Sequence, residues 1–134
     1  MRKSITLLLV LIMPIMLFGQ SYSSLWKQVD EAGDKDLPKT EYDILQKIVK
    51  KALKGKDYGQ LLKASLQSAQ VMATIATDSL MPTMAEMKRQ CESCDDEVLK
   101  TVWQTVLWRV SSRNSQLALD VEAPKLTPAL CERL

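Results

Sequence analysis

Apolar residues occur in two patterns along the chain, first as one nearly continuous run near the N-terminus and then as a regular recurrence. The run, residues 5–18, follows two basic residues, is broken at only two positions and ends at a small glycine. A basic start, a short apolar stretch and a small residue together are typical of a secretory signal peptide. A membrane-spanning helix needs about 20 apolar residues, which is more than this run provides. We therefore expect residues 1–19 to be a cleaved signal peptide rather than a membrane anchor.

The residue after the expected cleavage point bears on where the product resides. The end of the apolar run resembles the start of a bacterial lipoprotein cleavage box, in which the next residue is cysteine. This chain has Gln20 there, so no thiol is available to carry a lipid. We expect a periplasmic or secreted product with no stable membrane insertion after cleavage.

Beyond Gln20 the apolar residues recur every three or four positions, which is the period of an α-helix. There is no sustained alternation of the kind that marks a strand. Prolines in a first turn, glycines at an end and acidic or hydroxyl residues at a start then mark the boundaries. Five helices are predicted: Ser24–Ala32 with Gly33 as its stop, Pro38–Gly55, and three that start near Asp57, near Asp78 or Ser79, and after Asp95 and Asp96.

The apolar stripes on these helices predict the core, because a helix that packs on one side carries a stripe of apolar residues there. The second helix is expected to bury Tyr42, Leu45, Ile48, Val49 and Ala52. The third is expected to bury Leu62, Leu66, Ala69, Met72, Ala73 and Ala76. The fifth has the widest stripe, made of Val98, Leu99, Val102, Trp103, Val106, Leu107 and Val110.

The predicted fold is all-α and built from antiparallel helical hairpins. The short loops favour antiparallel packing of neighbouring helices. The first and third helices start about 33 residues apart, close to the period of a tetratricopeptide repeat, so the hairpins are either repeat-like or parts of an irregular bundle. We expect one helical domain over residues 20–115. Residues 116–134 contain two prolines and are predicted to be a linker, with a short helical turn from Thr127, or the start of a following domain.

Charge argues against some classes of partner. The two basic residues of the predicted signal peptide account for the formal net charge of +2, so the rest of the chain is close to neutral. A nucleic-acid-binding protein needs a concentrated basic face. The one candidate is the run Lys47, Lys50, Lys51, Lys54 and Lys56, whose spacing places it on the solvent side of the second helix. We therefore expect no nucleic-acid partner.

Candidate chemistry is limited, because the chain contains no histidine. Histidine is the commonest general base and metal ligand, so a Ser-His-Asp or Cys-His site is ruled out. The carboxylates show no catalytic pairing, and the three glycines beyond the signal peptide form no phosphate-binding loop. We expect no enzyme activity, no metal site and no cofactor.

The stretch CESC, from Cys91 to Cys94, is the one motif that invites a chemical interpretation. A redox pair favours a thioredoxin-like βαβ context, and no strands are predicted here. A zinc site needs four ligands, so it would have to combine the cysteines with a carboxylate. In an oxidising compartment Cys91, Cys94 and Cys131 could instead form one disulfide and leave one free thiol. The odd number of cysteines indicates an unpaired thiol or a partner elsewhere in a longer chain.

Large apolar side chains provide a candidate interaction surface. Met81, Met84 and Met87 form either a core stripe or a soft peptide-binding surface. Trp103 and Trp108 are five positions apart and do not share a helix face, so one is expected to pack inside and the other to lie at an interface. The candidate interaction residues are Trp26, Trp108, Met84 and Met87.

Three stretches of the chain are distinctive as sequences. They are SLWKQVDEAGDKDLPKTEYDILQKIVKKA from Ser24, KDYGQLLKASL from Lys56 and NSQLALDVEAPKLTPALCERL from Asn114. Together they resemble the N-terminal helical leader of secreted alpha-2-macroglobulin-like proteins of Bacteroidetes bacteria. In that family the leader precedes macroglobulin-type β-sandwich domains and a large helical region. The resemblance implies a chain truncated before those domains, and a part in trapping or inhibiting proteases in the cell envelope.

The resemblance does not extend to the family's reactive group. The thioester of that family, where present, uses a Cys-x-Glu-Gln motif, and CESC and CERL depart from it. Two functions remain in view. The first is a non-enzymatic helical scaffold or docking segment, whose protein partner is either the missing downstream domains or an envelope protein. The second is a free-standing periplasmic adaptor, similar to tetratricopeptide proteins, which binds a protein in a groove between hairpins.

Overall fold

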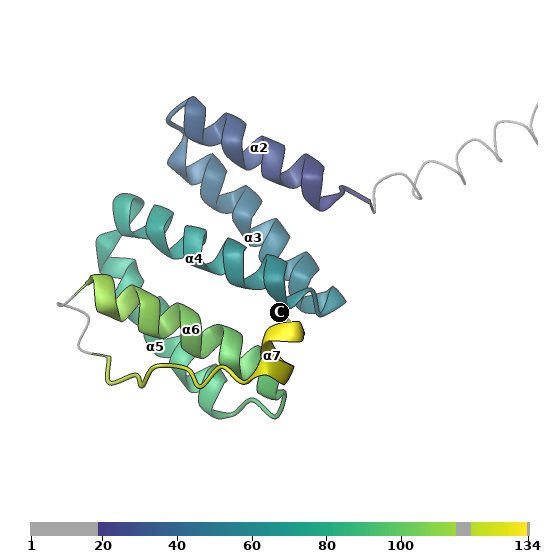
Figure 1. The fold of residues 1–134 in the computed structure, drawn as a ribbon. Coiled ribbons are helices and arrows are strands. Elements are labelled where there is room, and N and C mark those ends of the chain that lie inside the picture. The colour runs from purple at the N-terminus through teal and green to yellow at the C-terminus, as the bar shows by residue number, and fades with distance from the viewer. Residues whose placement is uncertain (1–18, 115–118, 134) are drawn as a thin grey trace, which may run out of the picture.

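The computed structural model describes residues 19–114 and 119–133, and this part of the chain is all-α (Figure 1). The helices are α2 Tyr22–Asp34, α3 Pro38–Gly55, α4 Tyr58–Ile75, α5 Thr77–Glu92, α6 Glu97–Arg113 and the short α7 Pro128–Glu132. No strand occurs among the described residues, so the predicted fold class is confirmed. The predicted signal peptide lies, except for Gly19, outside them.

Consecutive long helices run in alternating directions, so α2, α4 and α6 point one way and α3 and α5 the other (Figure 1). The pairs that pack extensively are α2–α3, α3–α4, α4–α5, α4–α6 and α5–α6. Because α4 belongs to three of these pairs, it is the central helix, with α2 and α3 on one side and α5 and α6 on the other. Neighbouring helices are therefore antiparallel, as the short loops predict.

Each part of the core includes residues of α4. The first cluster joins α2, α3 and α4 and contains Leu25, Val29, Ala32, Ile44, Leu45, Ile48, Ala64 and Val71. The second joins α4, α5 and α6 and contains Ala69, Leu80, Met84, Cys91 and Leu107. The third joins α3, α4 and α6 and contains Ala52, Tyr58, Leu61, Val98 and Val102. The central helix is therefore buried on more than one side.

The prediction of which face of α4 is buried is largely wrong. Of the six predicted residues, Ala69 is buried and the others are half-buried. The buried residues are instead Tyr58, Leu61, Ala64, Ser65, Ser68, Ala69 and Val71. Helices pack on both sides of α4, so its buried residues are not confined to one apolar stripe. Periodicity within one helix does not detect such a two-sided environment.

The helix α2 is longer than predicted at both ends. It begins at Tyr22 after a side-chain cap by Ser21, and it continues through Gly33, the predicted stop, to Asp34. The residue with left-handed backbone conformation lies further on, at Asp36, with φ 53°. Aspartate tolerates this conformation because its short polar side chain can form local hydrogen bonds. The chain therefore reverses at an aspartate rather than at the glycine.

The helix α3 ends as predicted at Gly55, but the glycine is not the residue that makes the turn. Lys56 has the left-handed conformation, with φ 54°. The amides of Lys56 and Asp57 donate to the carbonyls of Leu53 and Ala52, at 3.4 and 2.9 Å, which is the Schellman pattern of a helix end. A side chain with a Cβ thus occupies a position that favours glycine.

We expect Lys56→Gly to raise the free energy of unfolding by roughly 0.5–1 kcal/mol, because glycine adopts the left-handed conformation without steric cost. The matched control is Lys50→Gly, the same change at an exposed position inside α3. This control should lower the free energy of unfolding by about 1 kcal/mol. Urea denaturation of both variants measures the difference. A loss of stability at Lys56 equal to that at Lys50 would refute this account of the turn.

The start of α5 differs from the prediction by one or two residues. Only Ala76 separates α4 from α5, so Asp78 and Ser79 lie inside the first turn rather than at the cap. The cap position is Ala76, which has no side-chain hydrogen-bonding group, and its carbonyl accepts from the amide of Ser79 at 2.9 Å. A sharp turn between two packed helices therefore replaces the polar cap that a sequence signal would mark.

The predicted start of the fifth helix after Asp96 and the predicted helical turn from Thr127 are confirmed, and a side-chain cap is present at each. The Asp96 side chain accepts from the amides of Val98 and Leu99 at 3.0 and 3.2 Å, at the start of α6. The hydroxyl of Thr127 accepts from the amide of Leu130 at 3.3 Å, at the start of α7. Both signals involve only residues within one helical turn, so local sequence is sufficient to predict them.

A tyrosine–aspartate hydrogen bond recurs between successive parallel helices. Tyr22, the first residue of α2, donates to Asp57, which directly precedes α4, at 2.5 Å. Tyr58, the first residue of α4, donates in the same way to Asp96, which directly precedes α6. Burial, together with the bond to Asp57, raises the pKa of Tyr22 to about 12. The bond from Tyr58 lowers the pKa of Asp96. Together the two hydrogen bonds join the N-terminal ends of α2, α4 and α6.

We expect Asp96→Ala to lower the free energy of unfolding by about 1–2 kcal/mol, because it removes a helix cap and the acceptor of the buried Tyr58 hydroxyl. The pKa of Asp96 lies below its ordinary 3.8. Its contribution is therefore complete above that pH and is lost as the pH falls through the folded-state pKa. Urea denaturation over this pH range measures both effects. Asp95→Ala removes an exposed neighbouring carboxylate, and an equal loss there would contradict the role of Asp96.

Candidate functional site

The three cysteines are free thiols in different environments. Cys91 lies on the last turn of α5, is 6% exposed, and donates to the carbonyl of Lys100 at 3.4 Å. Cys94, before α6, is half-buried and donates to the carbonyl of Asp96 at 3.5 Å. Cys131, on α7, is exposed. Burial raises the pKa of the Cys91 thiol, whereas the attacking thiol of a redox pair has a lowered pKa.

We expect a thiol reagent to modify Cys131 rapidly, Cys94 more slowly and Cys91 only after unfolding, because exposure and thiolate fraction control the rate. A disulfide reagent that releases a coloured thiolate measures the three phases. Cys131→Ser should abolish the fast phase, and Cys91→Ser should leave it unchanged. Rapid modification of Cys91 in the folded chain would show that its thiol is not buried as described.

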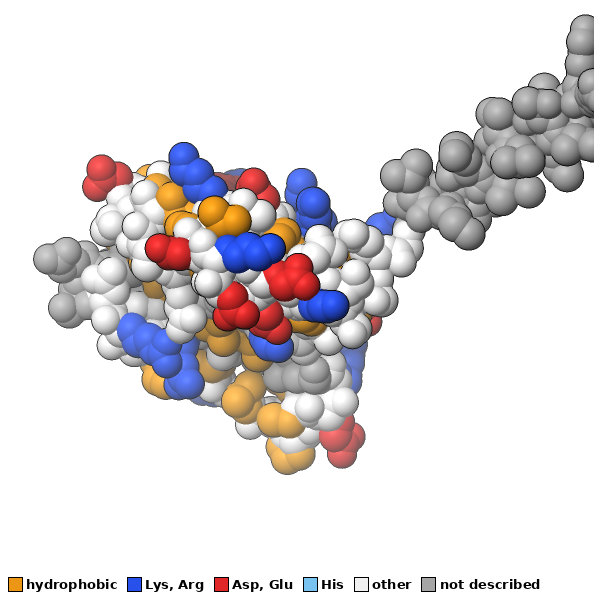
Figure 2. All heavy atoms as spheres, turned by 90° about the horizontal axis from the view of Figure 1, so that it is seen from above, with side chains coloured by type: hydrophobic (Ala, Val, Ile, Leu, Met, Phe, Trp, Pro, Cys, Tyr) orange, Lys and Arg blue, Asp and Glu red, His pale blue; other side chains and the backbone are white. Residues whose placement is uncertain are grey.

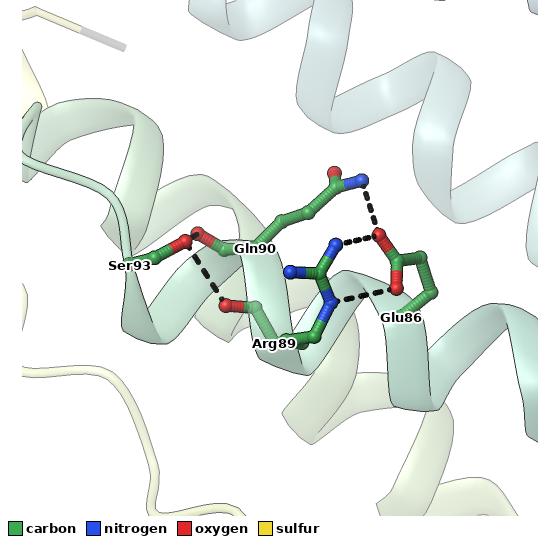
Figure 3. A network of polar contacts seen from close by, with 4 residues as sticks. All are labelled: Glu86, Arg89, Gln90 and Ser93. Atoms are coloured by element: carbon green, nitrogen blue, oxygen red, sulfur yellow. Dashed lines mark hydrogen bonds and ion pairs between the residues drawn. The ribbon is translucent and has the colours of Figure 1, made fainter.

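The acidic and basic side chains at the end of α5 bond to one another along their own helix. Figure 3 shows Glu86 accepting from Arg89 Nε and Nη2 at 2.9 and 2.6 Å and from Gln90 Nε2 at 2.9 Å. The bonds from Arg89 and then Gln90 lower the pKa of Glu86 to about 2. The Ser93 hydroxyl donates to the carbonyl of Arg89 at 3.2 Å. Across the described residues, no group of three or more His, Cys, Asp or Glu side chains is placed to hold a metal ion.

The four predicted interaction residues do not share one surface. Trp26 of α2 is half-buried, and its indole N–H donates to Gln60 of α4 at 2.7 Å. The Lys63 ammonium lies 4.0 Å from the centre of the Trp26 ring. Trp108 lies on α6 and is half-buried, as is Trp103, so the expected contrast in burial between them is absent. The two methionines lie on α5, which is not among the helices that pack extensively against α2, where Trp26 lies, and Met84 is buried in the core.

A groove runs over α4 between α3 and α5, two helices that are not among the extensively packed pairs. We name it the methionine groove. Its lining residues are Tyr42, Gln46 and Val49 of α3, Ser65, Ser68, Ala69 and Met72 of α4, and Thr83, Met84 and Met87 of α5. Met84 is 2% exposed and belongs to the core, whereas Met72 and Met87 are half-buried and reach the surface. Met81 is 42% exposed and does not line the groove.

The methionine groove widens toward the turn between α4 and α5. The wider part has a volume of about 270 Å³ and is lined by Lys39, Tyr42, Asp43, Met72, Ile75, Ala76 and Ser79. Tyr42 and Met72 line both parts, and the charged residues Lys39 and Asp43 lie at this end only. Inside the narrow part the polar groups pair with each other, since Gln46 donates to the Ser68 hydroxyl at 3.2 Å.

Met72 and Tyr42 were predicted to belong to the apolar core stripes of their helices, and their position in the lining of a groove was not predicted. Each does pack against a core cluster, Tyr42 against the first and Met72 against the second. The groove lies where these two clusters meet, and it exists because α3 and α5 stay apart over α4. No pattern within a single helix signals that separation.

The segment predicted to be a linker lies against the helices. Residues 119–127 are extended and run beside α5 and α6 before α7 begins (Figure 1). Leu119 and Val121 pack against the second core cluster, and Leu130 of α7 packs against the third. This part of the chain therefore covers a second groove, between α5 and α6.

Side chains of both charge signs are interspersed with apolar ones on the face shown in Figure 2. The lysines of the basic run on α3 are exposed, except for Lys51, which is half-buried. The Lys51 ammonium lies 4.7 Å from the centre of the Tyr22 ring. The predicted position of this run on the solvent side of α3 is confirmed.

Comparison of the chain with protein-family models, with curated proteins and with solved structures finds no match. Within the described residues, no helix combines the length and the apolar character needed to cross a membrane. Function is therefore inferred first from the two grooves.

Proposed function

We propose that this chain is a non-enzymatic helical docking segment whose methionine groove receives an apolar surface of a protein partner. The observation that carries the proposal is the groove itself, which is lined by half-buried methionines between two helices that stay apart. Methionine is unbranched and polarizable, so a surface that contains it adapts to the shape of a partner. The two charged residues at the wide end, Lys39 and Asp43, provide the polar rim that protein interfaces have around an apolar centre.

The chemistry of the side chains supports a non-enzymatic role. The chain has no histidine, and the thiol of Cys91 is buried, with its pKa raised rather than lowered. The charged network at the end of α5 consists of neighbours within one helix. The side chains of this network, Glu86, Arg89 and Gln90, stabilise the helix and line neither the groove over α4 nor the cavity beside Cys91.

The resemblance to the leader of alpha-2-macroglobulin-like proteins supports the identity of the partner. In the proposal, the methionine groove docks either a downstream domain of the same longer chain or another envelope protein. Its contribution to protease trapping is then to position those domains. The predicted signal peptide supports a location of this assembly in the periplasm or outside the cell.

A second candidate is a free-standing adaptor of repeat-like helical hairpins. The observation that favours it is the recurrent hydrogen bond from Tyr22 to Asp57 and from Tyr58 to Asp96. The same residue types at the same helix positions join α2 to α4 and α4 to α6, as expected of stacked equivalent units. In this alternative the groove binds a separate protein.

A photo-reactive amino acid tests the groove. Placed at Met87, inside the methionine groove, it should cross-link to the partner in the envelope fraction of cells that express the protein. Placed at Met81, which is 42% exposed on the same helix but outside the groove, it should not. Mass spectrometry of the adduct identifies the partner as downstream sequence or as another protein. Absence of an adduct at Met87, or equal yields at both sites, would reject the proposed docking surface.

The mass of the native product separates the two candidates. An antibody raised to residues 38–76 should detect, for the leader, a band several times larger than this chain. For the adaptor it should detect a species of about 115 residues that begins at Gln20, which intact mass confirms.

A further inference from the structure

The extended segment after α6 alternates between inward and outward residues. Leu119 and Val121 are half-buried and pack against the second core cluster, whereas Asp120 and Glu122 are exposed. A period of two is characteristic of an extended chain that lies on a surface. Residues 119–122 therefore lie on the helices as a bound peptide would, with two apolar anchors one residue apart.

The helices on both sides of this segment bind its backbone. Lys88 of α5 donates from Nζ to the carbonyl of Asp120 at 3.1 Å. Gln104 of α6 donates from Nε2 to the carbonyl of Glu122 at 3.4 Å. Contacts to carbonyls fix an extended backbone without regard to its side chains, whereas the pockets for alternate side chains provide the selectivity.

The groove under this segment has features that complement acidic residues. Lys88 and Lys100 line it, with Glu92 as the one carboxylate contributed by the helices. Asp120 and Glu122 lie at its edge. Two ammonium groups and one carboxylate on the helices favour an acidic segment over a basic one, chiefly through the rate of association.

From this geometry we infer that the groove between α5 and α6 is a recognition site for extended acidic peptide segments with apolar residues at alternate positions, and that residues 119–122 occupy it in cis. We name it the tail groove. It shares no lining residue with the methionine groove, so this inference goes beyond the proposed function. We call residues 119–122 the tail. A partner segment with apolar residues at alternate positions and acidic residues between them would bind by displacing the tail.

The tail does not fill the groove. A cavity of about 280 Å³ remains beside Val121, with Cys91 and Leu107 among its lining residues. A longer apolar side chain at this position would bury additional surface there. A peptide with leucine in place of Val121 should therefore bind about fourfold more tightly, the value of one buried methylene group.

The test uses the full chain and a fluorescent, end-capped peptide with the sequence of residues 119–126, LDVEAPKL. In the double variant Leu119→Asp with Val121→Asp, the cis segment loses both anchors and leaves the groove open. Fluorescence polarisation should then show at least about tenfold tighter peptide binding than the unmodified chain, in which the tethered tail competes at high effective concentration. Val121→Asn alone, a smaller change, should give a smaller gain and does not depend on the double variant folding.

The matched control is Leu126→Asp, in the same segment but 53% exposed and outside the groove, which should bind the peptide no better than the unmodified chain. A peptide carrying aspartate at both anchor positions should not bind. If the variants keep their helical circular dichroism and bind neither peptide, the inference is wrong. It is also wrong if both peptides bind equally. A dimer of the unmodified chain that the double variant converts to monomers would overturn occupancy in cis, because the tail would then belong to a second copy.

Discussion

The structure depends on the burial of α4 between two helical hairpins. Each core cluster takes residues from this helix, Ala64 and Val71 in the first, Ala69 in the second, and Tyr58 and Leu61 in the third. Several buried residues of this helix are small, namely Ala64, Ser65, Ser68 and Ala69, and neighbouring helices pack against it from both sides. Neither hairpin can bury its apolar face without this helix, so we expect the unit to fold as one cooperative domain.

The two grooves are consequences of this central position. Helices that pack on opposite sides of α4 need not meet each other, and the gap between α3 and α5 is the methionine groove. The helices α5 and α6 do meet, but their outer surface remains partly apolar, and the extended tail covers it with Leu119 and Val121. The two proposed binding surfaces therefore lie where helix packing is incomplete.

Polar contacts set the register of the hairpins at one end. The bonds from Tyr22 to Asp57 and from Tyr58 to Asp96 join the starts of three parallel helices. In each pair the aspartate precedes a helix, where negative charge is favourable because of the helix dipole. The tyrosine hydroxyl thus binds a carboxylate that already has a role in local structure, which links local helix formation to tertiary packing.

The sequence by itself determined the all-α class, the bounds of α3, and the starts of α6 and α7, because these depend on residues within a few positions of one another. Only the tertiary structure decided which face of α4 is buried, that Met84 belongs to the core while Met87 reaches the surface, and that the tail lies against α5 and α6. Helical periodicity shows that a helix has an apolar face, but the burial of each residue depends on how many neighbours pack around it. That number is set by contacts between segments far apart in the chain.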